Sequence, residues 1–226
     1  FYNDCVKLKF KQNLVLIEKV GWIKCNESIV NQKFTNPRCS FDGKYWYLTV
    51  GIEVETEKSV LDGRIVGVDV GIRELAVTSD GVFYENINKT ASVRKVEKRL
   101  KRLQRRASKK YKKGTLKSKH LLKLEGKIRK HHRRLVNIRT NHVHQATAEI
   151  VKSKPFRIVM ETLNIRGMMK DKHLAKAVAN QKLYFFKQCL QYKCELNGIE
   201  FVEADQWFPS SKLCNNCGTL KKDLKR

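Results

Sequence analysis

The chain has 226 residues, enough to bury a real core in one large domain or two small ones. It carries 48 Lys and Arg residues against 22 Asp and Glu residues, a net charge of +26 that favours a polyanionic partner such as nucleic acid. No apolar run approaches the roughly 20 residues of a membrane span, and there is no signal peptide or initiator Met, so we expect a soluble, intracellular chain that is clipped in front.

The first 60 residues contain several short segments typical of strands. Residues 46–54 alternate apolar and polar side chains, and residues 6–10 and 13–17 have a similar composition. These segments predict a small β module. Seven cysteines at irregular spacing argue against a disulfide framework. The cysteines of this module are expected to be small buried residues, namely Cys5, Cys25 and Cys39.

The next segment predicts a meander of three strands. Residues 61–63 have the composition of a turn and precede an apolar strand over residues 65–70. Two further strands are expected over residues 75–78 and 82–84, with a turn at 79–81 between them.

A basic segment follows the meander. Residues 89–139 hold 22 Lys or Arg residues against only two acids, Glu97 and Glu125. Residues 109–119 include Gly114 and have no periodic apolar set, so they predict the tip of a helical hairpin. The apolar residues on either side keep helical spacing in two stripes: Val93, Val96, Leu100 and Leu103, then Leu121, Leu124, Ile128, Leu135 and Ile138.

The basic hairpin is either a solvated surface or an arm that follows nucleic-acid phosphates. The second interpretation is favoured because each neutralised phosphate releases counterions, whereas unpartnered charges only destabilise the fold. His131 and His132 are expected to join this surface rather than bind a metal. The residues expected to contact phosphates are Arg94, Lys98, Arg99, Lys101, Arg102, Arg105, Arg106, Lys109, Lys110, Lys127, Arg129, Lys130, Arg133 and Arg134.

The chain then returns to mixed structure. Residues 156–160 and 199–204 predict strands, and residues 183–196 predict a helix between them, so the whole is expected to be a mixed α/β domain. On the helix, the aromatic run Tyr184, Phe185 and Phe186 is more typical of core than of a base-stacking platform. Cys189 and Cys194 are five helical steps apart and are expected to face different sides, which argues against a zinc pair.

Two acids lie at or near the ends of apolar strands. Asp69 lies within GVDVG and Glu161 ends IVMET, so neighbouring strands would bring their carboxylates together to hold Mg²⁺ through oxygen ligands. Alternatively, Asp69 sets a turn and Glu161 caps or pairs at the surface. GVDVG is also similar to the phosphate loop of actin-like sugar kinases, but no second Gly-rich phosphate loop follows it.

The last residues contain Cys214 and Cys217 in a C-x-x-C-G motif, which supplies two of the four ligands that a structural zinc requires. The other pair of ligands is expected beyond residue 226. Ser210, Ser211 and Lys212 precede the motif and either contact backbone phosphate or form an ordinary loop.

The order of these segments resembles one known family. GVDVGIRELAVTSDG, a long basic helical pair, IVMETLNIRGMMK and NGIEFVEADQWFPSSKLCNNCG resemble, in this order, the TnpB (OrfB) proteins of bacterial insertion sequences, which are RNA-guided nucleases related to type V CRISPR effectors. The resemblance implies an RNase H-like (RuvC) domain over residues 61–208, interrupted by the basic hairpin at about 89–152. It also implies a partial β-barrel wedge module that grips guide RNA over residues 1–60, and half of a zinc ribbon over residues 209–226.

The same resemblance implies a mechanism and partners. Asp69 matches the first RuvC acid and Glu161 the second, in a two-metal Mg²⁺ site, while Cys214 and Cys217 match the first half of the Zn²⁺ ribbon. The implied partners are a guide RNA encoded by the transposon and target DNA, in the prokaryotic cytoplasm near the nucleoid and without a membrane.

Two departures from the family pattern bear on activity. The second C-x-x-C and the third catalytic acid, an Asp in a D-R-D-x-N-A-A type motif, are absent from these 226 residues, as are the early wedge strand and the helical recognition lobe. A site with two of three acids should bind Mg²⁺ weakly, so we expect no DNA cleavage by this chain. The alternative hypothesis is a nucleic-acid-binding remnant without catalysis.

Overall fold

We describe the protein from a computed structural model, which covers residues 9–27, 33–54 and 60–205 together with positions 213, 217 and 219. The first two ranges contain only strands, turns and loops, as the sequence predicts. An antiparallel sheet has the order β1-β2-β3, and an antiparallel ribbon pairs β4 with β5. Their bounds are β1 (Lys9–Lys11), β2 (Leu14–Ile17), β3 (Gly21–Lys24), β4 (Phe34–Phe41) and β5 (Trp46–Ile52).

The prediction that cysteines of this module are buried is wrong for those that the structure describes. Cys39 is exposed and Cys25 is half-buried, while Cys5 lies outside the described residues. The reason is that Cys39 lies on a ribbon of two strands, opposite Leu48, and no described strand or helix covers that side of the pair. The aromatic pair Phe41 and Trp46, with ring centroids 4.9 Å apart, is exposed on the same side.

The second part of the chain is built on a five-stranded mixed sheet with the order β10-β9-β6-β7-β8. β6, β9 and β10 are parallel, and β7 and β8 add the predicted antiparallel meander. This confirms the mixed α/β class. The bounds are β6 (Asp62–Val70), β7 (Ala76–Thr78), β8 (Phe83–Tyr84), β9 (Pro155–Glu161) and β10 (Glu200–Ala204).

One turn prediction next to this sheet is wrong. Residues 61–63 were expected to turn, but Asp62 already belongs to β6 and pairs with Pro155. Its backbone N–H donates to the carbonyl of Lys154 at 2.8 Å. The parallel partner strand, which is distant in the sequence, therefore extends β6 through residues whose local preference is for a turn.

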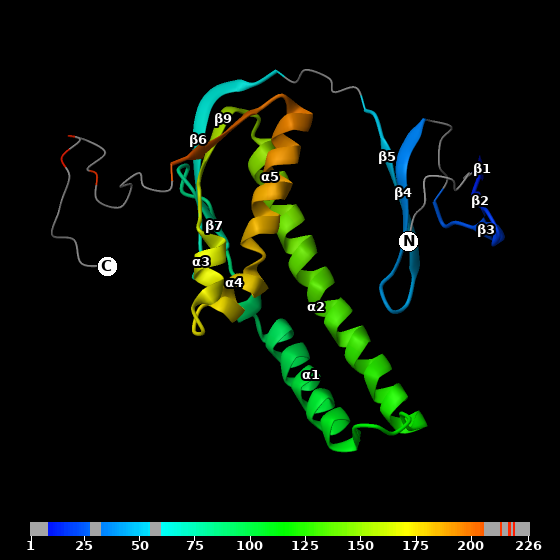
Figure 1. Ribbon diagram of the computed structural model, residues 1–226. Helices are drawn as coiled ribbons and strands as arrows, with labels where there is room; N and C mark the ends of the chain where they lie inside the picture. The colour runs from blue at the N-terminus through cyan, green and yellow to red at the C-terminus, as the bar shows by residue number, and fades with distance from the viewer. Residues whose placement is uncertain are drawn as a thin grey trace.

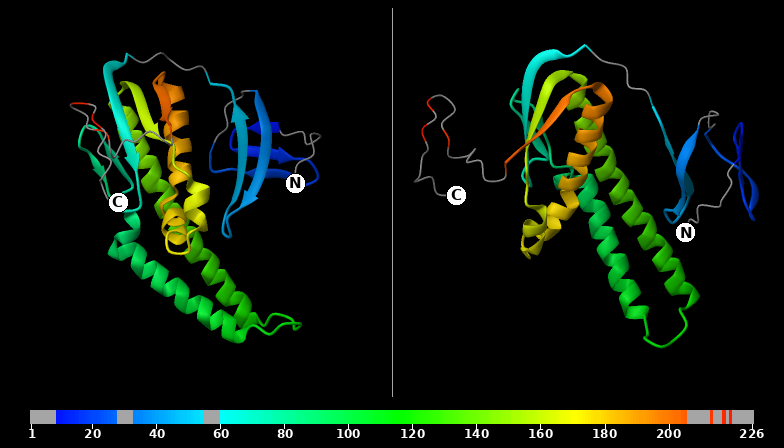
Figure 2. Two further views of the ribbon diagram at one scale, coloured as in Figure 1. Left: turned by 60° about the vertical axis from the view of Figure 1, so that its left-hand side comes forward. Right: turned by 45° about the horizontal axis from the view of Figure 1, so that its top comes forward.

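Helices cover one face of the sheet. Figures 1 and 2 show α2 and α5 side by side on that face, and no helix among the described residues covers the opposite one. The buried core combines alternate residues of β6 and β9 with apolar residues of the two helices, such as Val143, Ile150 and Phe186. The helices are η1 (Ile87–Lys89), α1 (Ala91–Lys110), α2 (Lys119–Lys152), α3 (Ile165–Lys170), α4 (Ala175–Gln181) and α5 (Leu183–Asn197). None of them is long and apolar enough to span a membrane.

The predicted basic hairpin is confirmed as α1 and the first half of α2. Thr90 and Ser118 cap the two helices by accepting the N–H groups of Val93 and Leu121. Gly114, with φ +77°, lies in the tip between them. All the residues of the predicted apolar stripes are buried or half-buried along the hairpin, although Ile128 and Ile138 are only partly covered. The tip projects away from the sheet in Figure 1.

Helix α5 is covered on more than one side, because it contacts both α2 and β10. Cys189 and Cys194 are both buried in the core although they were expected to face different sides of the helix. Burial raises the pKa of the Cys194 thiol to about 12, so it is unsuited to metal binding as a thiolate. Phe186 is in the core, as predicted, but Tyr184 is 58% exposed.

Candidate metal site and nucleic-acid surface

The two candidate acids lie at the carboxyl ends of adjacent parallel strands. Val68 of β6 is in register with Met160 of β9, so Asp69 and Glu161 are the next residues on each strand. Neighbouring strands are about 4.8 Å apart. Val68 and Met160 point into the core, and side chains alternate along a strand, so Asp69 and Glu161 point to the opposite face of the sheet. The structure therefore brings the two carboxylates together on one face.

The alternative roles for these acids do not match the structure. Asp69 lies inside β6 rather than in a turn, and the cap of α3 is Asn164, whose side chain accepts the N–H of Gly167 at 2.9 Å. Asp69 is exposed and Glu161 half-buried, and neither forms an ion pair with another described residue. Two carboxylates without a protein cation fit a hard divalent ion, although the described residues contain no group of three or more potential ligands.

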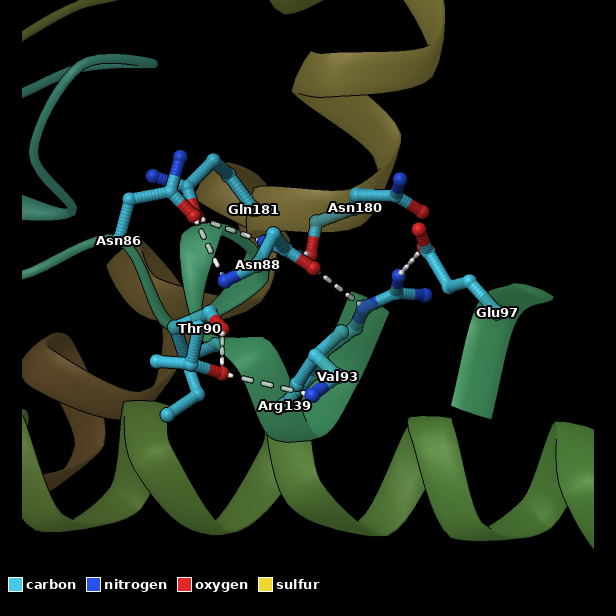
Figure 3. Close-up of polar contacts among 9 residues, drawn as sticks. Asn86, Asn88, Thr90, Val93, Glu97, Arg139, Asn180 and Gln181 are labelled. Carbon is cyan, nitrogen blue, oxygen red and sulfur yellow. Dashed lines mark hydrogen bonds and ion pairs between the residues drawn. The ribbon is translucent and has the colours of Figure 1, made fainter. Parts of the chain in front are cut away.

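A network of polar side chains joins the base of the hairpin to the rest of the domain (Figure 3). Asn88 accepts a hydrogen bond from Nε of Arg139 at 2.7 Å and donates to Gln181 at 3.0 Å. The other side of the Arg139 guanidinium binds Glu97 at 2.7 Å. Residues of η1, α1, α2 and α4 thus meet at one point, which fixes the direction in which the hairpin leaves the sheet.

This network also holds the loop that follows Asp69. The buried amide of Gln181 donates to the carbonyl of Gly71 at 3.1 Å, and that of Asn86 donates to the carbonyl of Ile72 at 2.7 Å. Gly71 is only two residues beyond Asp69, so these hydrogen bonds connect the base of the basic hairpin to the candidate metal site.

The exposed surface of the hairpin is rich in Lys and Arg. Its two acids are already paired within it, Glu97 with Arg139 and Glu125 with Lys117 at 2.8 Å. Thirteen of the predicted phosphate-contacting residues are exposed, and none of them forms an ion pair within the described part of the chain. They are Arg94, Lys98, Arg99, Lys101, Arg102, Arg105, Arg106, Lys109, Lys110, Lys127, Arg129, Lys130 and Arg134.

The fourteenth predicted residue, Arg133, is instead half-buried against the β4–β5 turn. Its guanidinium lies 3.3 Å from a carboxylate oxygen of Asp42 and over the ring of Tyr45. His131 is half-buried, and burial followed by the charges of Arg99 and Arg134 lowers its pKa, so this histidine adds little positive charge to the surface.

The candidate residues at the end of the chain are only partly described. Cys217 is exposed, with its sulfur 3.2 Å from the hydroxyl of Thr219. Cys214, Ser210, Ser211 and Lys212 lie outside the described residues. The zinc half-site therefore stays a prediction.

Several residues of the site were not predicted from the sequence. Asn86, Asn88 and Gln181 are ordinary polar residues in three separate segments, and only the fold brings them together. Asp42 is one acid in a turn of the β module. The sequence signal for Asp42 is compositional only: acids are outnumbered by Lys and Arg in this chain, so a cation is near most of them.

Comparison with known proteins gives two matches to family models. Residues 49–172 match OrfB_IS605, described as "Probable transposase", and residues 184–226 match the "Cas12f1-like, TNB domain". The first match covers the strand with Asp69, the whole hairpin and the strand that ends at Glu161.

Individual relatives point to the same family. A Streptomyces pristinaespiralis protein named "Putative RNA-guided DNA endonuclease" is 32% identical over 79% of this chain and 42% of its own length. "Putative RNA-guided DNA endonuclease InsQ" of Escherichia coli K12 is 28% identical over 98% of this chain and 57% of its own. The chain thus spans about half the length of these relatives. A Cas12f1 chain in a complex with sgRNA and target DNA is similar at 19% identity and a TM-score of 0.48, over 78% of this chain and 36% of its own.

Proposed function

Because this chain belongs to the TnpB (OrfB) family of insertion-sequence transposon proteins, we propose that it is the nuclease core of an RNA-guided DNA endonuclease. In this proposal the basic hairpin follows the phosphates of a guide RNA and its DNA target, and Asp69 and Glu161 provide two carboxylates of the hydrolytic site. The observation that carries the proposal is the register of β6 and β9, which brings these acids together on one face of the sheet.

The sheet supports assignment to the RNase H-like (RuvC) class, since β6, the strand of the first acid, is central and Asp69 and Glu161 are on adjacent strands. The hairpin would then be an insertion between β8 and β9. We extend the proposal to a wedge-like role of β1–β5 in binding guide RNA and to a zinc ribbon that begins with Cys214 and Cys217. The guide RNA would be encoded by the transposon.

The proposed cofactor is Mg²⁺, and Asp69 and Glu161 would hold it through carboxylate oxygens. When bound, the ion would activate a water molecule and stabilise the leaving oxygen of the phosphodiester. The protein itself would position the first acid and the nucleic acid. Gln181 and Asn86 fix the loop after Asp69, and the hairpin cations orient the nucleic-acid backbone.

Metal binding tests this proposal directly. Titration of the chain with Mn²⁺, a paramagnetic substitute for Mg²⁺, is followed by electron paramagnetic resonance. We expect Asp69→Asn and Glu161→Gln each to weaken Mn²⁺ binding at least tenfold. Glu195→Gln is the matched control, because Glu195 is an exposed acid on α5 outside the proposed site. Equal Mn²⁺ affinity for all three variants would overturn the metal site.

A second candidate function is nucleic-acid binding without catalysis. The observation that favours it is the contrast between thirteen exposed, unpaired cations and a candidate site with two described acids. Asp69→Ala discriminates between the candidates. If the protein is a nuclease, Asp69→Ala should abolish any Mg²⁺-dependent DNA cleavage. If it only binds nucleic acid, Asp69→Ala should change metal binding alone. RNA affinity should be unaffected in both cases.

A further inference from the structure

A cavity lies next to Glu161 and is lined by residues that follow β9 and by residues of α5. Its volume is about 280 Å³, near the lower end of the range of small-ligand sites. Met160, Leu163 and Ile165 give it an apolar lining, and Glu161 forms part of its wall. The cavity therefore begins where β9 ends, at the carboxyl edge of the sheet, which is the usual place for ligands in α/β folds.

The rest of the wall consists of the amide of Asn164, the ring of Tyr184 and two cations, Arg166 and Lys187. Tyr184 projects from the first turn of α5 and is 58% exposed, although its neighbours Leu183 and Phe186 are almost completely buried. The core therefore does not require the ring of Tyr184. Lys187, one turn further along the same helix, pairs with Glu203 at 2.5 Å. Arg166 forms no ion pair with any described residue.

This combination fits one class of ligand. An apolar recess with an exposed aromatic ring accepts a nucleobase, because every base has a face that can stack. An unpaired arginine at the rim accepts a phosphate. Glu161 in the wall repels a phosphate, whereas Arg166 attracts one, so the base would occupy the cavity and its phosphate the side of Arg166.

We propose that this cavity holds the nucleotide of the DNA strand that is next to the scissile phosphate, with its base on Tyr184 and its phosphate at Arg166. The inference rests on the proposed function, in which Glu161 is one of the two acids of the hydrolytic site. Tyr184 and Arg166 are thus substrate-binding residues that set where the strand lies relative to the two acids.

Photo-crosslinking tests the base contact. A DNA tetranucleotide that carries one 5-iododeoxyuridine is bound to the chain in EDTA, irradiated, and mapped by mass spectrometry. We expect a crosslink to Tyr184 that Tyr184→Phe keeps and Tyr184→Ala loses. Affinity for the tetranucleotide should fall about 5- to 150-fold in Tyr184→Ala, corresponding to about 1–3 kcal/mol for one stacked base. Tyr192→Ala is the control, because Tyr192 is an exposed tyrosine of α5 outside the cavity.

The phosphate contact has a separate readout. Arg166→Gln should reduce the slope of log affinity against log salt by about one, and Tyr184→Ala should leave the slope unchanged. Lys170→Gln is the control, because Lys170 is an exposed lysine at the other end of α3. If the slope of log affinity against log salt is unchanged in Arg166→Gln, Arg166 does not bind a phosphate and this part of the proposal is wrong.

The outcomes separate this inference from the function on which it rests. Crosslinks confined to other aromatic residues, or an undiminished crosslink in Tyr184→Ala, would overturn the base site. Tighter binding of the matched RNA tetranucleotide would overturn its assignment to the DNA strand. Because the crosslinking is done in EDTA, none of these results depends on the metal, whereas failure of the nuclease proposal appears as unchanged Mn²⁺ binding in the Asp69 and Glu161 variants.

Discussion

At the scale of single residues, Asp42 shows how local hydrogen bonds change the pKa of a half-buried carboxylate. The backbone N–H of Tyr45 donates to it at 2.8 Å and is the main cause that lowers its pKa from 3.8 to about 2. The N–H of Lys44, the hydroxyl of Tyr47 and the guanidinium of Arg133 act in the same direction. Asp42 therefore keeps the β4–β5 turn and α2 in contact while it is ionised.

The pH dependence of this contact follows from the direction of the shift. Because the folded pKa is below the unfolded one, the stabilisation is complete above about pH 3.8 and is lost as the pH falls through about 2. We expect the carboxyl signal of Asp42 in a nuclear magnetic resonance titration to have its midpoint near 2. In Arg133→Gln the midpoint should stay low, since the Tyr45 bond remains. A midpoint at the ordinary value in the unmodified chain would contradict the hydrogen-bonded turn.

Asn88 is the residue on which the polar network at the hairpin base depends. Its side chain contacts Arg139 and Gln181, so Asn88→Ala leaves a buried amide and a largely buried guanidinium with fewer partners. We expect a loss of about 1–3 kcal/mol in the free energy of unfolding, measured by urea denaturation. Asn137→Ala, at an exposed position of α2, should change it by less than about 0.5 kcal/mol. Equal effects would show that the network does not stabilise the fold.

At the scale of elements, the basic hairpin should determine how binding depends on salt. Each phosphate contact contributes about 0.9 to the slope of log affinity against log salt for duplex DNA. We expect Arg102→Gln with Arg106→Gln to reduce this slope by about two, because both residues are exposed and unpaired on α1. The matched control replaces Lys154 and Lys172, which are exposed outside the hairpin, and should leave the slope nearly unchanged. Fluorescence anisotropy at several salt concentrations provides the measurement.

The elements with strong local signals were predicted accurately from the sequence. The apolar period along α1 and α2, together with Gly114 at the tip, predicted both helices and the turn, because each helix buries an apolar stripe that is periodic within its own segment. The start of β6 was predicted incorrectly, since Asp62 is ordered by Pro155, more than ninety residues later. Cys39 was predicted to be buried but is exposed, because no described layer covers its side of the β4–β5 ribbon.

The candidate site also contains residues that the sequence predicts and residues that only the fold brings together. Asp69 and Glu161 could be identified because each ends a recognisable apolar strand, and their proximity needed only that the strands be neighbours, which the register of β6 and β9 shows. The side chains that hold the surrounding loop, such as Gln181 and Asn86, have no sequence signal, because each acts through a backbone carbonyl that only the fold brings within reach. Tyr184 was predicted as core, since periodicity alone does not show which side of a helix is left uncovered.

At the scale of the whole molecule, positive and negative charge lie in two separate regions: one would bind phosphates and the other would bind a metal ion. The hairpin concentrates exposed cations around two acids that are already paired, whereas the end of the sheet presents two unpaired carboxylates. The Asn88 network connects the two regions through hydrogen bonds to Arg139 and, by way of Gln181, to the loop after Asp69. A bound nucleic acid would therefore be held by the hairpin at a fixed position relative to Asp69, and its affinity should be independent of the acids.

Because the basic hairpin and the two acids are separate regions, we predict that the 226-residue chain binds nucleic acid without cleaving it. The described residues bring together two acids and no third ligand, so Mg²⁺ should bind weakly and the attacking water should be poorly positioned. We expect the purified chain to bind structured RNA and DNA, with no measurable cutting of a labelled duplex in Mg²⁺. Asp69→Ala should leave RNA affinity within about twofold, as both regions fold independently of this exposed carboxylate. Mg²⁺-dependent cutting that disappears in Glu161→Gln would contradict the prediction.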